Sequence, residues 1–262
     1  MHFQQVVLKT VDAFYAAIPR PEPPPEALEC ARLVAHRGAW GKGRPENTLK
    51  AFDAALEAGV WGVELDLRWS ADPQPIILHD PDCRRVFGQD CLPARLRREE
   101  LKQLVPGVPE LAEVVARYGK RLHLMLEIKE ENYPSPDVQS QRLASVLSPL
   151  RPIRDYHVLA LNPALFDRFP WLPREACVTV SQANPHAMSA VTLEKNYGAF
   201  TGHYLLTNRR LLHRHQTAGQ RVGVGFPASR NSLIREINRR VDWIFTNHAL
   251  RLQKHLDRML RA

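Results

Sequence analysis

The sequence has few features that would anchor or cross-link the chain. No stretch approaches the roughly 20 consecutive apolar residues that a membrane-spanning helix needs. The four cysteines (Cys30, Cys83, Cys91 and Cys177) form no C-x-x-C pair and lack the clustering of a zinc site. We therefore expect free thiols in a reducing compartment, with a Cys83–Cys91 bridge as the alternative. The first residues show no basic leader followed by an apolar core, so we expect a cytoplasmic protein.

The charge distribution argues against a nucleic-acid partner. The formal charge is +8 and the pI is about 9.6, yet the basic residues occur in short clusters without interleaved aromatic residues. A nucleic-acid-binding protein usually shows a basic stripe, so we expect no nucleic-acid partner. A basic surface that attracts a phosphate-containing small molecule explains the charge better, and transient contact with a membrane surface stays open. The sequence does not indicate an oligomeric state.

No G-x-G-x-x-G follows a predicted strand, which argues against a dinucleotide fold. Short β-branched runs instead alternate with helical patterns from Ala31 onward, which is typical of a parallel sheet. Strands are predicted at 32–35, 62–67, 122–128, 157–161, 177–180, 199–203, 222–226 and 243–246. Helices are predicted between them, for example at 47–58, 111–118, 138–147, 209–218 and 233–239. Eight such strands in residues 31–262 predict an α/β fold of the (β/α)8 TIM-barrel type.

Residues 1–30 are predicted to form a separate N-terminal element. The apolar residues recur at helical spacing over residues 3–18, at Phe3, Val7, Val11, Phe14, Tyr15 and Ile18. The stretch IPRPEPPPEA (18–27) then interrupts any helix and is predicted to be an extended linker. We expect this amphipathic helix to dock on the barrel, because its polar face carries few of the cations that membrane-surface helices show.

One strand-like segment does not fit the alternation. Residues 75–79 (PIILH) follow the second predicted strand after only about eight residues, which is too few for a parallel crossover but enough for an antiparallel return. The sequence ADPQ before it has turn chemistry. We therefore predict a hairpin excursion whose end lies over the mouth of the barrel, and not a ninth barrel strand.

Three carboxylates are placed near the ends of predicted strands. Glu64 and Asp66 share the inward face of the second strand, because Val63 and its alternate neighbours form the opposite apolar face. Glu127 ends the neighbouring strand. Carboxylates that point into a packed interior need a cation or hydrogen bonds. The set predicts a site for a hard divalent ion, Mg²⁺ or Ca²⁺.

Two histidines reach the same mouth on separate connections. His36 ends the first strand and His79 ends the predicted hairpin, and histidine titrates near neutrality. This pair is suited to general acid and base catalysis of phosphodiester cleavage, without an indication of which residue is the acid. Arg37 and Lys129 follow the first histidine and the third carboxylate. They are predicted to bind the non-bridging phosphate oxygens.

At these residues the sequence resembles the glycerophosphodiester phosphodiesterase family. The likeness is carried by AHRGAWGKGRPENTLKAF (35–52), VELDLRWSADPQPIILHD (63–80) and LEIK (126–129), and more weakly by the rest of the chain. The resemblance implies a phosphatidylinositol-phosphodiesterase-like barrel. It implies a divalent ion held by Glu64, Asp66 and Glu127, with His36 and His79 as acid and base. It also implies that Glu46 and its neighbour Asn47 support the substrate mouth, although Asn47 or Thr48 is equally suited to cap the first helix.

The sequence departs from the family late in the chain. The family's tryptophan near the seventh strand is replaced here in VGVGFPASRN, where Phe226 is predicted to form a hydrophobic wall for the substrate. The leading expectation is hydrolysis of a glycerophosphodiester to an alcohol and glycerol 3-phosphate. Hydrolysis of lysophospholipids is the alternative within the same class. A catalytically silent barrel that binds anionic ligands is the alternative from another class, and the complete set of two histidines and three carboxylates argues against it.

Overall fold

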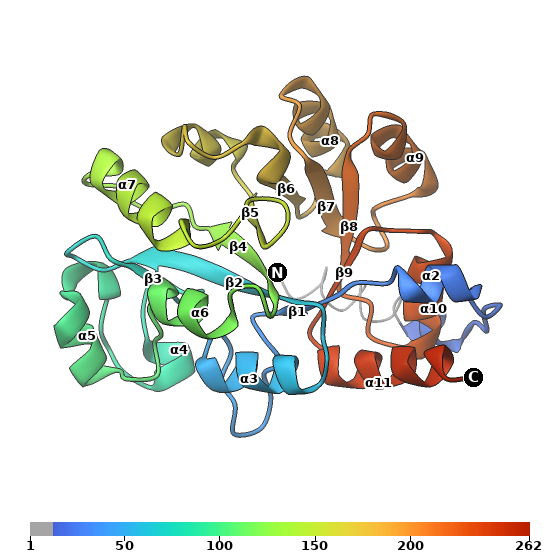
Figure 1. Ribbon diagram of the computed structural model, residues 1–262, viewed down its shortest axis with the longest axis horizontal. Helices are drawn as coiled ribbons and strands as arrows, with labels where there is room; N and C mark the ends of the chain where they lie inside the picture. Colours follow the sequence, from blue (N-terminus) through green and yellow to red (C-terminus); the bar gives the residue numbers. More distant parts are fainter. Residues whose placement is uncertain (1–12) are drawn as a thin grey trace.

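Eight parallel strands close into a barrel in the computed structural model, which describes residues 13–262. The strands are β1 (Leu33–His36), β2 (Gly62–Trp69), β4 (His123–Ile128), β5 (Tyr156–Ala160), β6 (Cys177–Ser181), β7 (Ala199–His203), β8 (Arg221–Gly225) and β9 (Trp243–Thr246). β1 pairs in parallel with both β2 and β9, which closes the ring (Figure 1). The predicted TIM barrel is confirmed, and every predicted strand lies within a residue or two of an observed one.

The alternation along β2 separates the interior of the barrel from the layer beneath the helices. Val63, Leu65 and Leu67 are fully buried in the large apolar core that the helices share with the outside of the barrel. Glu64 and Asp66, which lie between them in the sequence, are also buried but on the inward face. A smaller apolar cluster, which includes Val34, Met125, Leu159, Val178 and Trp243, fills the interior below the carboxylates. The parity predicted for the second strand is therefore confirmed.

The strand β3 (Pro75–Ile77) pairs antiparallel with the end of β2. Its register places Ile77 opposite Leu67, beyond the part of β2 that pairs with β1. β3 is followed by α4 (Arg84–Phe87), η1 (Pro93–Arg95) and α5 (Arg98–Leu104), which pack on a separate small apolar cluster. The predicted hairpin excursion is confirmed, and it brings His79 to the mouth.

Helices lie outside the strands. They are α3 (Leu49–Glu57), α6 (Leu111–Tyr118), α7 (Pro136–Leu147), η2 (Pro163–Arg168), η3 (Arg174–Ala176), α8 (Pro185–Glu194), α9 (Arg209–Thr217), α10 (Arg230–Asn238) and α11 (Ala249–Leu260). α3 and α11 lie side by side along one flank (Figure 1). α3 begins after Thr48, whose side chain accepts a hydrogen bond from the Ala51 backbone nitrogen at 3.3 Å. Thr48, and not Asn47, is therefore the cap of this helix.

The segment before the barrel contacts its outside. Residues 13–17 are helical, and the ring of Tyr15 lies 6.5 Å from that of Tyr204 in an edge-to-face arrangement. The predicted apolar positions Phe3, Val7 and Val11 lie outside the described residues. The predicted linker is not extended throughout, because α2 (Pro25–Glu29) begins inside it. Proline at the first helical position lacks only an amide hydrogen that would have no partner there, so Pro25 starts the helix.

Two further properties bear on the predictions from composition. All four cysteines are free thiols, Cys83 and Cys91 included. Among residues 13–262, no helix is long and apolar enough to cross a membrane.

Candidate active site

A cavity of about 490 Å³ opens at the carboxyl ends of the barrel strands. This is the end of a TIM barrel at which active sites are built. The predicted site residues that line the cavity are His36, Arg37, Glu64, His79, Glu127, Lys129 and Phe226. The remaining two, Glu46 and Asp66, contact these residues from behind the lining. All the residues predicted from the sequence therefore come together at one mouth.

The three carboxylates form a compact buried group. In the register of the sheet, Asp66 on β2 lies opposite Glu127 on β4. Glu64 is two residues earlier on β2, so its side chain projects to the same face as that of Asp66. One oxygen from each of the three residues lies within 4.8 Å of the others, and in the described part of the chain no other group of this kind could hold a metal ion.

The electrostatics of this group favour a bound cation. Burial raises the pKa of Glu64 well above its ordinary value, and the charges of Asp66 and Glu127 raise it further. The Oε1 atom of Glu64 is buried and has no hydrogen-bond partner in the structure. A hard divalent ion bound among these oxygens would satisfy that atom and relieve the repulsion. The donor set therefore fits the predicted metal.

Two cationic side chains partly neutralise the carboxylates. The Lys129 ammonium lies 2.5 Å from Oδ1 of Asp66 and also pairs with Glu127. The Arg37 guanidinium lies 3.4 Å from Oδ2 of Asp66. Burial opposes ionisation of Asp66, but Lys129 and Arg37 outweigh it and hold the pKa of this carboxyl below its ordinary value. Asp66 is thus kept ionised at neutral pH.

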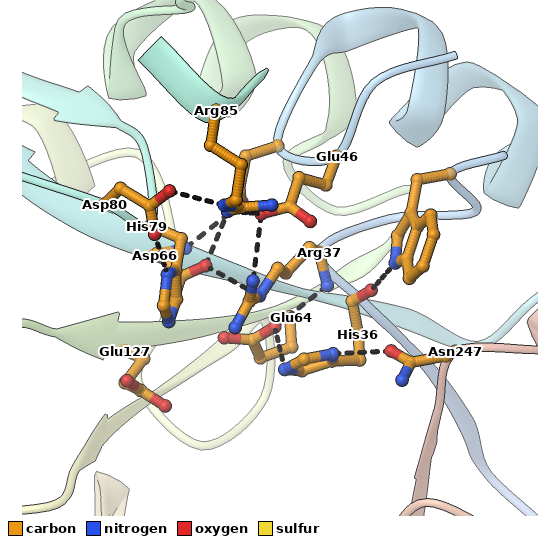
Figure 2. A network of polar contacts seen from close by, with 12 residues as sticks. His36, Arg37, Glu46, Glu64, Asp66, His79, Asp80, Arg85, Glu127 and Asn247 are labelled. Carbon is orange, nitrogen blue, oxygen red and sulfur yellow. Dashed lines mark hydrogen bonds and ion pairs between the residues drawn. The ribbon is translucent and has the colours of Figure 1, made fainter. Parts of the chain in front are cut away.

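His36 is held by a neutral partner. Its Nδ1 lies 2.7 Å from Oδ1 of Asn247 in the loop after β9, and Nε2 faces Oε2 of Glu64 at 3.8 Å (Figure 2). Because the amide oxygen accepts a hydrogen from Nδ1, Nε2 is the unprotonated nitrogen of the ring. Burial and the nearby charge of Arg37 lower the pKa of His36 to about 4. His36 is therefore neutral at pH 7.

His79 is held by an anion instead. Its Nδ1 lies 2.7 Å from Oδ1 of Asp80 (Figure 2). Arg68 on β2 donates from Nε and a terminal nitrogen to the backbone oxygen of His79, at 2.9 and 2.7 Å. Burial favours the neutral acid at Asp80, but hydrogen bonds from Arg85 and His79 lower the pKa of Asp80 to about 2. The ring of His79 is thus oriented by the Asp80 carboxylate, and its backbone is held by Arg68.

The loop after β1 braces the site from outside. Glu46 accepts from Arg37 at 2.9 Å and from Arg85 at 2.5 Å (Figure 2). Asn47 is buried with φ = 56° and donates from Nδ2 to Oδ2 of Asp66 at 2.6 Å, while its Oδ1 accepts from the Asp66 backbone nitrogen. Glu46 is therefore engaged by two arginines, and Asn47 positions a carboxylate.

The opposite side of the cavity is apolar. Phe226 lies edge-on to His36 with ring centroids 5.1 Å apart. The other apolar lining residues are Leu159, Leu161, Val180 and Phe245. Among them, Ser181 is buried and its Oγ has no hydrogen-bond partner. The cavity therefore combines a charged wall with a largely apolar wall.

Sequence reasoning missed several supporting residues. Asp80 and Asn247 lie in loops, where no strand or helix periodicity indicates the direction of a side chain, and Arg85 lies on the four-residue helix α4, which is too short to show one. The only signals were local, because Asp80 directly follows His79 and Asn247 directly follows a predicted strand end. Arg68 follows the inward parity of Glu64 and Asp66 and could have been found from it.

The chain is similar to known proteins in sequence and in fold. The family model described as "Glycerophosphoryl diester phosphodiesterase family" matches residues 36–249. The glycerophosphodiester phosphodiesterase of Caldanaerobacter subterraneus is 29% identical over 126 residues, which is 44% of this chain and 51% of that protein. The enzyme of the same name from Bacillus altitudinis is 28% identical over 124 residues, which is 42% of this chain and 50% of that protein. The chain thus spans about half the length of the curated relatives that it matches.

Solved structures extend the likeness of the fold to most of the chain. An Oleispira antarctica phosphodiesterase in complex with the product sn-glycerol-3-phosphate superposes with a TM-score of 0.73 at 23% identity, covering 88% of this chain and 99% of that one. The glycerophosphodiester phosphodiesterase of Thermotoga maritima superposes with a TM-score of 0.70 at 23% identity, covering 86% and 97%. At this level of identity the likeness supports the barrel fold.

Proposed function

The chain belongs to the glycerophosphoryl diester phosphodiesterase family, and we propose that it hydrolyses a glycerophosphodiester to an alcohol and glycerol 3-phosphate with a divalent ion, Mg²⁺ or Ca²⁺. The observation that carries the proposal is the meeting of His36, His79 and three buried carboxylates in one cavity. A module that only bound an anion would gain nothing from a buried cluster of like charges, which disfavours an anionic ligand. The silent-barrel alternative is therefore the weaker one.

Glu64, Asp66 and Glu127 would hold the ion. When bound, it would neutralise negative charge on the phosphate and lower the pKa of a hydroxyl beside it. Arg37 and Lys129 line the same wall and supply hydrogen-bond donors to the non-bridging phosphate oxygens. Glu46 orients the Arg37 guanidinium for this contact, since it accepts from it at 2.9 Å.

The two histidines would divide the proton transfers. In a first step, His36 takes the proton of the attacking glycerol 2-hydroxyl at Nε2, because Asn247 occupies Nδ1 and leaves Nε2 as an acceptor. The 2-oxygen bonds to phosphorus as the bond to the alcohol breaks, and water then opens the resulting cyclic phosphate to glycerol 3-phosphate. His79 gives a proton to the oxygen of the departing alcohol, because the Asp80 carboxylate stabilises the positively charged ring that an acid requires. On the basis of the partners of the two rings, we therefore propose His36 as the base and His79 as the acid.

The apolar wall favours a second candidate within the same reaction class. Phe226, Leu161 and Val180 line the cavity next to the histidines and could accept an acyl chain. A lysophospholipid would place its phosphodiester on the charged wall and its chain along the apolar one.

A substrate panel tests the proposal. Glycerophosphodiesters with choline, ethanolamine, glycerol and inositol head groups and lysophospholipids with the same head groups would be assayed for release of glycerol phosphate and free alcohol. We expect turnover of at least one glycerophosphodiester in the presence of Mg²⁺ or Ca²⁺. Turnover of lysophospholipids alone would favour the second candidate, and no turnover of any substrate with either ion would refute both.

A further inference from the structure

Three exposed aromatic side chains are associated with the mouth of the barrel. Trp40 in the loop after β1 is 39% exposed, Phe226 in the loop after β8 is 40% exposed, and Phe14 is 65% exposed. Exposed apolar residues are normally scattered and need no explanation. These three are connected to one another through the site.

The inner half of the connection starts at His36. Its backbone oxygen accepts a hydrogen bond from the Trp40 indole nitrogen at 3.1 Å, and its ring contacts that of Phe226. On its other side, the Phe226 ring lies 6.0 Å from that of His203 at the end of β7. The aromatic line therefore begins at a proposed catalytic residue and follows the rim over β1, β8 and β7.

The outer half of the line ends at the segment before the barrel. Tyr204 stacks on His203 with centroids 5.2 Å apart, and Tyr15 packs edge-on against Tyr204. Phe14 lies 6.0 Å from Tyr15 and is the most exposed of the three aromatic residues. Asn231 on α10 donates to the backbone oxygen of Ala16 at 2.7 Å and so fixes this segment next to the rim.

The same sector of the rim is basic. Lys42, Arg230 and Arg251 are exposed in or next to the loops after β1, β8 and β9. Between residues 199 and 251 the sequence holds only two acids. Glu236 is fully buried, and Asp242 precedes β9 at the end of the barrel opposite the mouth. Of the three cations, Arg230 pairs with Glu22, so the sector keeps a net positive charge.

We propose that this rim docks the mouth of the barrel on the surface of an anionic lipid bilayer. The docking surface, here called the aromatic–basic rim, consists of Phe14, Trp40, Lys42, Phe226, Arg230 and Arg251. The amphipathic indole of Trp40 is suited to the level of the lipid head groups. The apolar rings of Phe14 and Phe226 can insert at the boundary with the acyl chains, and nearby cations are attracted to anionic lipids. The cavity opens beside this sector, with Phe226 in its lining, so docking would present the histidines to a phosphodiester at the membrane surface. The biological use of this surface rests on the proposed function, whereas the surface itself is argued from its aromatic and basic residues alone.

Vesicle binding by the full chain tests the docking surface. Sedimentation would compare vesicles of phosphatidylglycerol and phosphatidylcholine with vesicles of phosphatidylcholine alone, at low and high salt. We expect binding to the anionic vesicles only, weakened by salt. The double variant Phe14→Ser with Lys42→Glu should bind at least about fivefold more weakly, which is the expected effect of one cation near the surface.

A matched control changes one exposed apolar residue and one exposed lysine at the other end of the barrel. Leu260 is 47% exposed at the end of α11, and Lys195 is exposed at the end of α8. Leu260→Ser with Lys195→Glu should leave vesicle binding unchanged. Neither double variant touches the cavity, so both should hydrolyse a water-soluble glycerophosphodiester at the rate of the unaltered protein.

Three results would overturn the docking surface. They are equal binding to neutral and anionic vesicles, an equal loss of binding in the control variant, and a rim variant that changes the oligomeric state in ultracentrifugation while vesicle binding persists. The last result would indicate a second copy of the chain as the occupant. If vesicle binding follows the expected pattern but no glycerophosphodiester is hydrolysed, the docking surface stands and the proposed activity is refuted.

Discussion

At the scale of single residues, Asn47 illustrates what sequence patterns miss. It is buried in a left-handed conformation, which asparagine adopts more readily than most residues. From there it donates to one proposed metal ligand, Asp66, and accepts from the backbone of the same residue. Such a role depends on the path of a loop, so the sequence alone left helix capping and site support equally open for Asn47.

The variant Asn47→Ala is expected to bind Mg²⁺ or Ca²⁺ about 10–100-fold more weakly, because partners that orient metal ligands typically contribute this much affinity. Thr48→Ala is the matched control next to it. Loss of this helix cap should cost about 1 kcal/mol of stability and leave ion affinity unchanged. Calorimetric titration of both variants with each ion measures the difference. Equal ion affinity in the two variants would contradict the role given to Asn47.

Replacing either His36 or His79 by Ala is expected to lower the rate of hydrolysis by roughly 10²–10⁴-fold, because each change removes one proton transfer. Both residues lie at strand ends beside the cavity, so the free energy of unfolding should fall by about 1 kcal/mol or less. Steady-state kinetics and thermal unfolding measure the two effects. The opposite pattern, lost stability with near-normal turnover, would show that the histidines are structural.

An activated substrate separates the two roles. A glycerol p-nitrophenyl phosphodiester has a leaving group that needs no protonation. On this substrate His79→Ala should recover most of the lost rate, whereas His36→Ala should stay slow. Rescue of His36→Ala instead would reverse the assignment of acid and base.

At the scale of elements, periodicity predicted the strands and the direction of their side chains. The alternation along β2 placed Glu64 and Asp66 inside the barrel, and the short spacing before residues 75–79 predicted the hairpin that carries His79. Loops carry no such periodicity. The partners Asp80 and Asn247 come from loops and Arg85 comes from the four-residue helix α4, and all three became visible only in the structure. The helix α2 was missed because a run of three prolines usually indicates an extended linker. The last of them, Pro25, is instead the first residue of the helix.

The amino ends of β4 and β5 hold a buried histidine pair that the proposed reaction does not use. Nε2 of His123 lies 2.7 Å from Nδ1 of His157, and Arg221 contacts the far side of His157 at 3.1 Å. Burial lowers the pKa of His123 to about 4. Burial and the neighbouring His123 together lower the pKa of His157 to about 2. The ordinary value is 6.5, so the unfolded chain binds more protons than the folded one below that pH.

The sign of this difference predicts loss of stability in acid. The contribution of the neutral histidine pair to the free energy of unfolding is complete above pH 6.5. It declines as the pH falls toward 4 and below. One such histidine costs about 2 kcal/mol at pH 5 relative to neutral pH. Urea unfolding at pH 7.5 and 5.0 measures this. The loss of unfolding free energy between pH 7.5 and 5.0 should be smaller in His123→Gln. It should be unchanged in His213→Gln, because His213 is exposed on α9. An equal decline in both variants would exclude the pair as its cause.

At the scale of the whole molecule, eight predicted strands with intervening helices favoured a closed barrel over an open doubly wound sheet. The lack of a G-x-G-x-x-G motif after any predicted strand supported the same choice. β1, β2 and β4 are consecutive neighbours in the sheet, which explains why residues 36 to 129 form one site. Closure through the pairing of β1 with β9 adds Asn247 beside His36. The position of the segment before the barrel could not be predicted, since it depends on contacts such as that between Tyr15 and Tyr204.

The central claim is that the three carboxylates hold a divalent ion on which phosphodiester hydrolysis depends. The most direct measurement is the release of glycerol 3-phosphate from a glycerophosphodiester by protein stripped with EDTA, before and after Mg²⁺ or Ca²⁺ is added. We expect no release from the stripped protein and recovery with one of the ions, but no recovery for Glu64→Gln. Full turnover by the metal-free protein would contradict the claim.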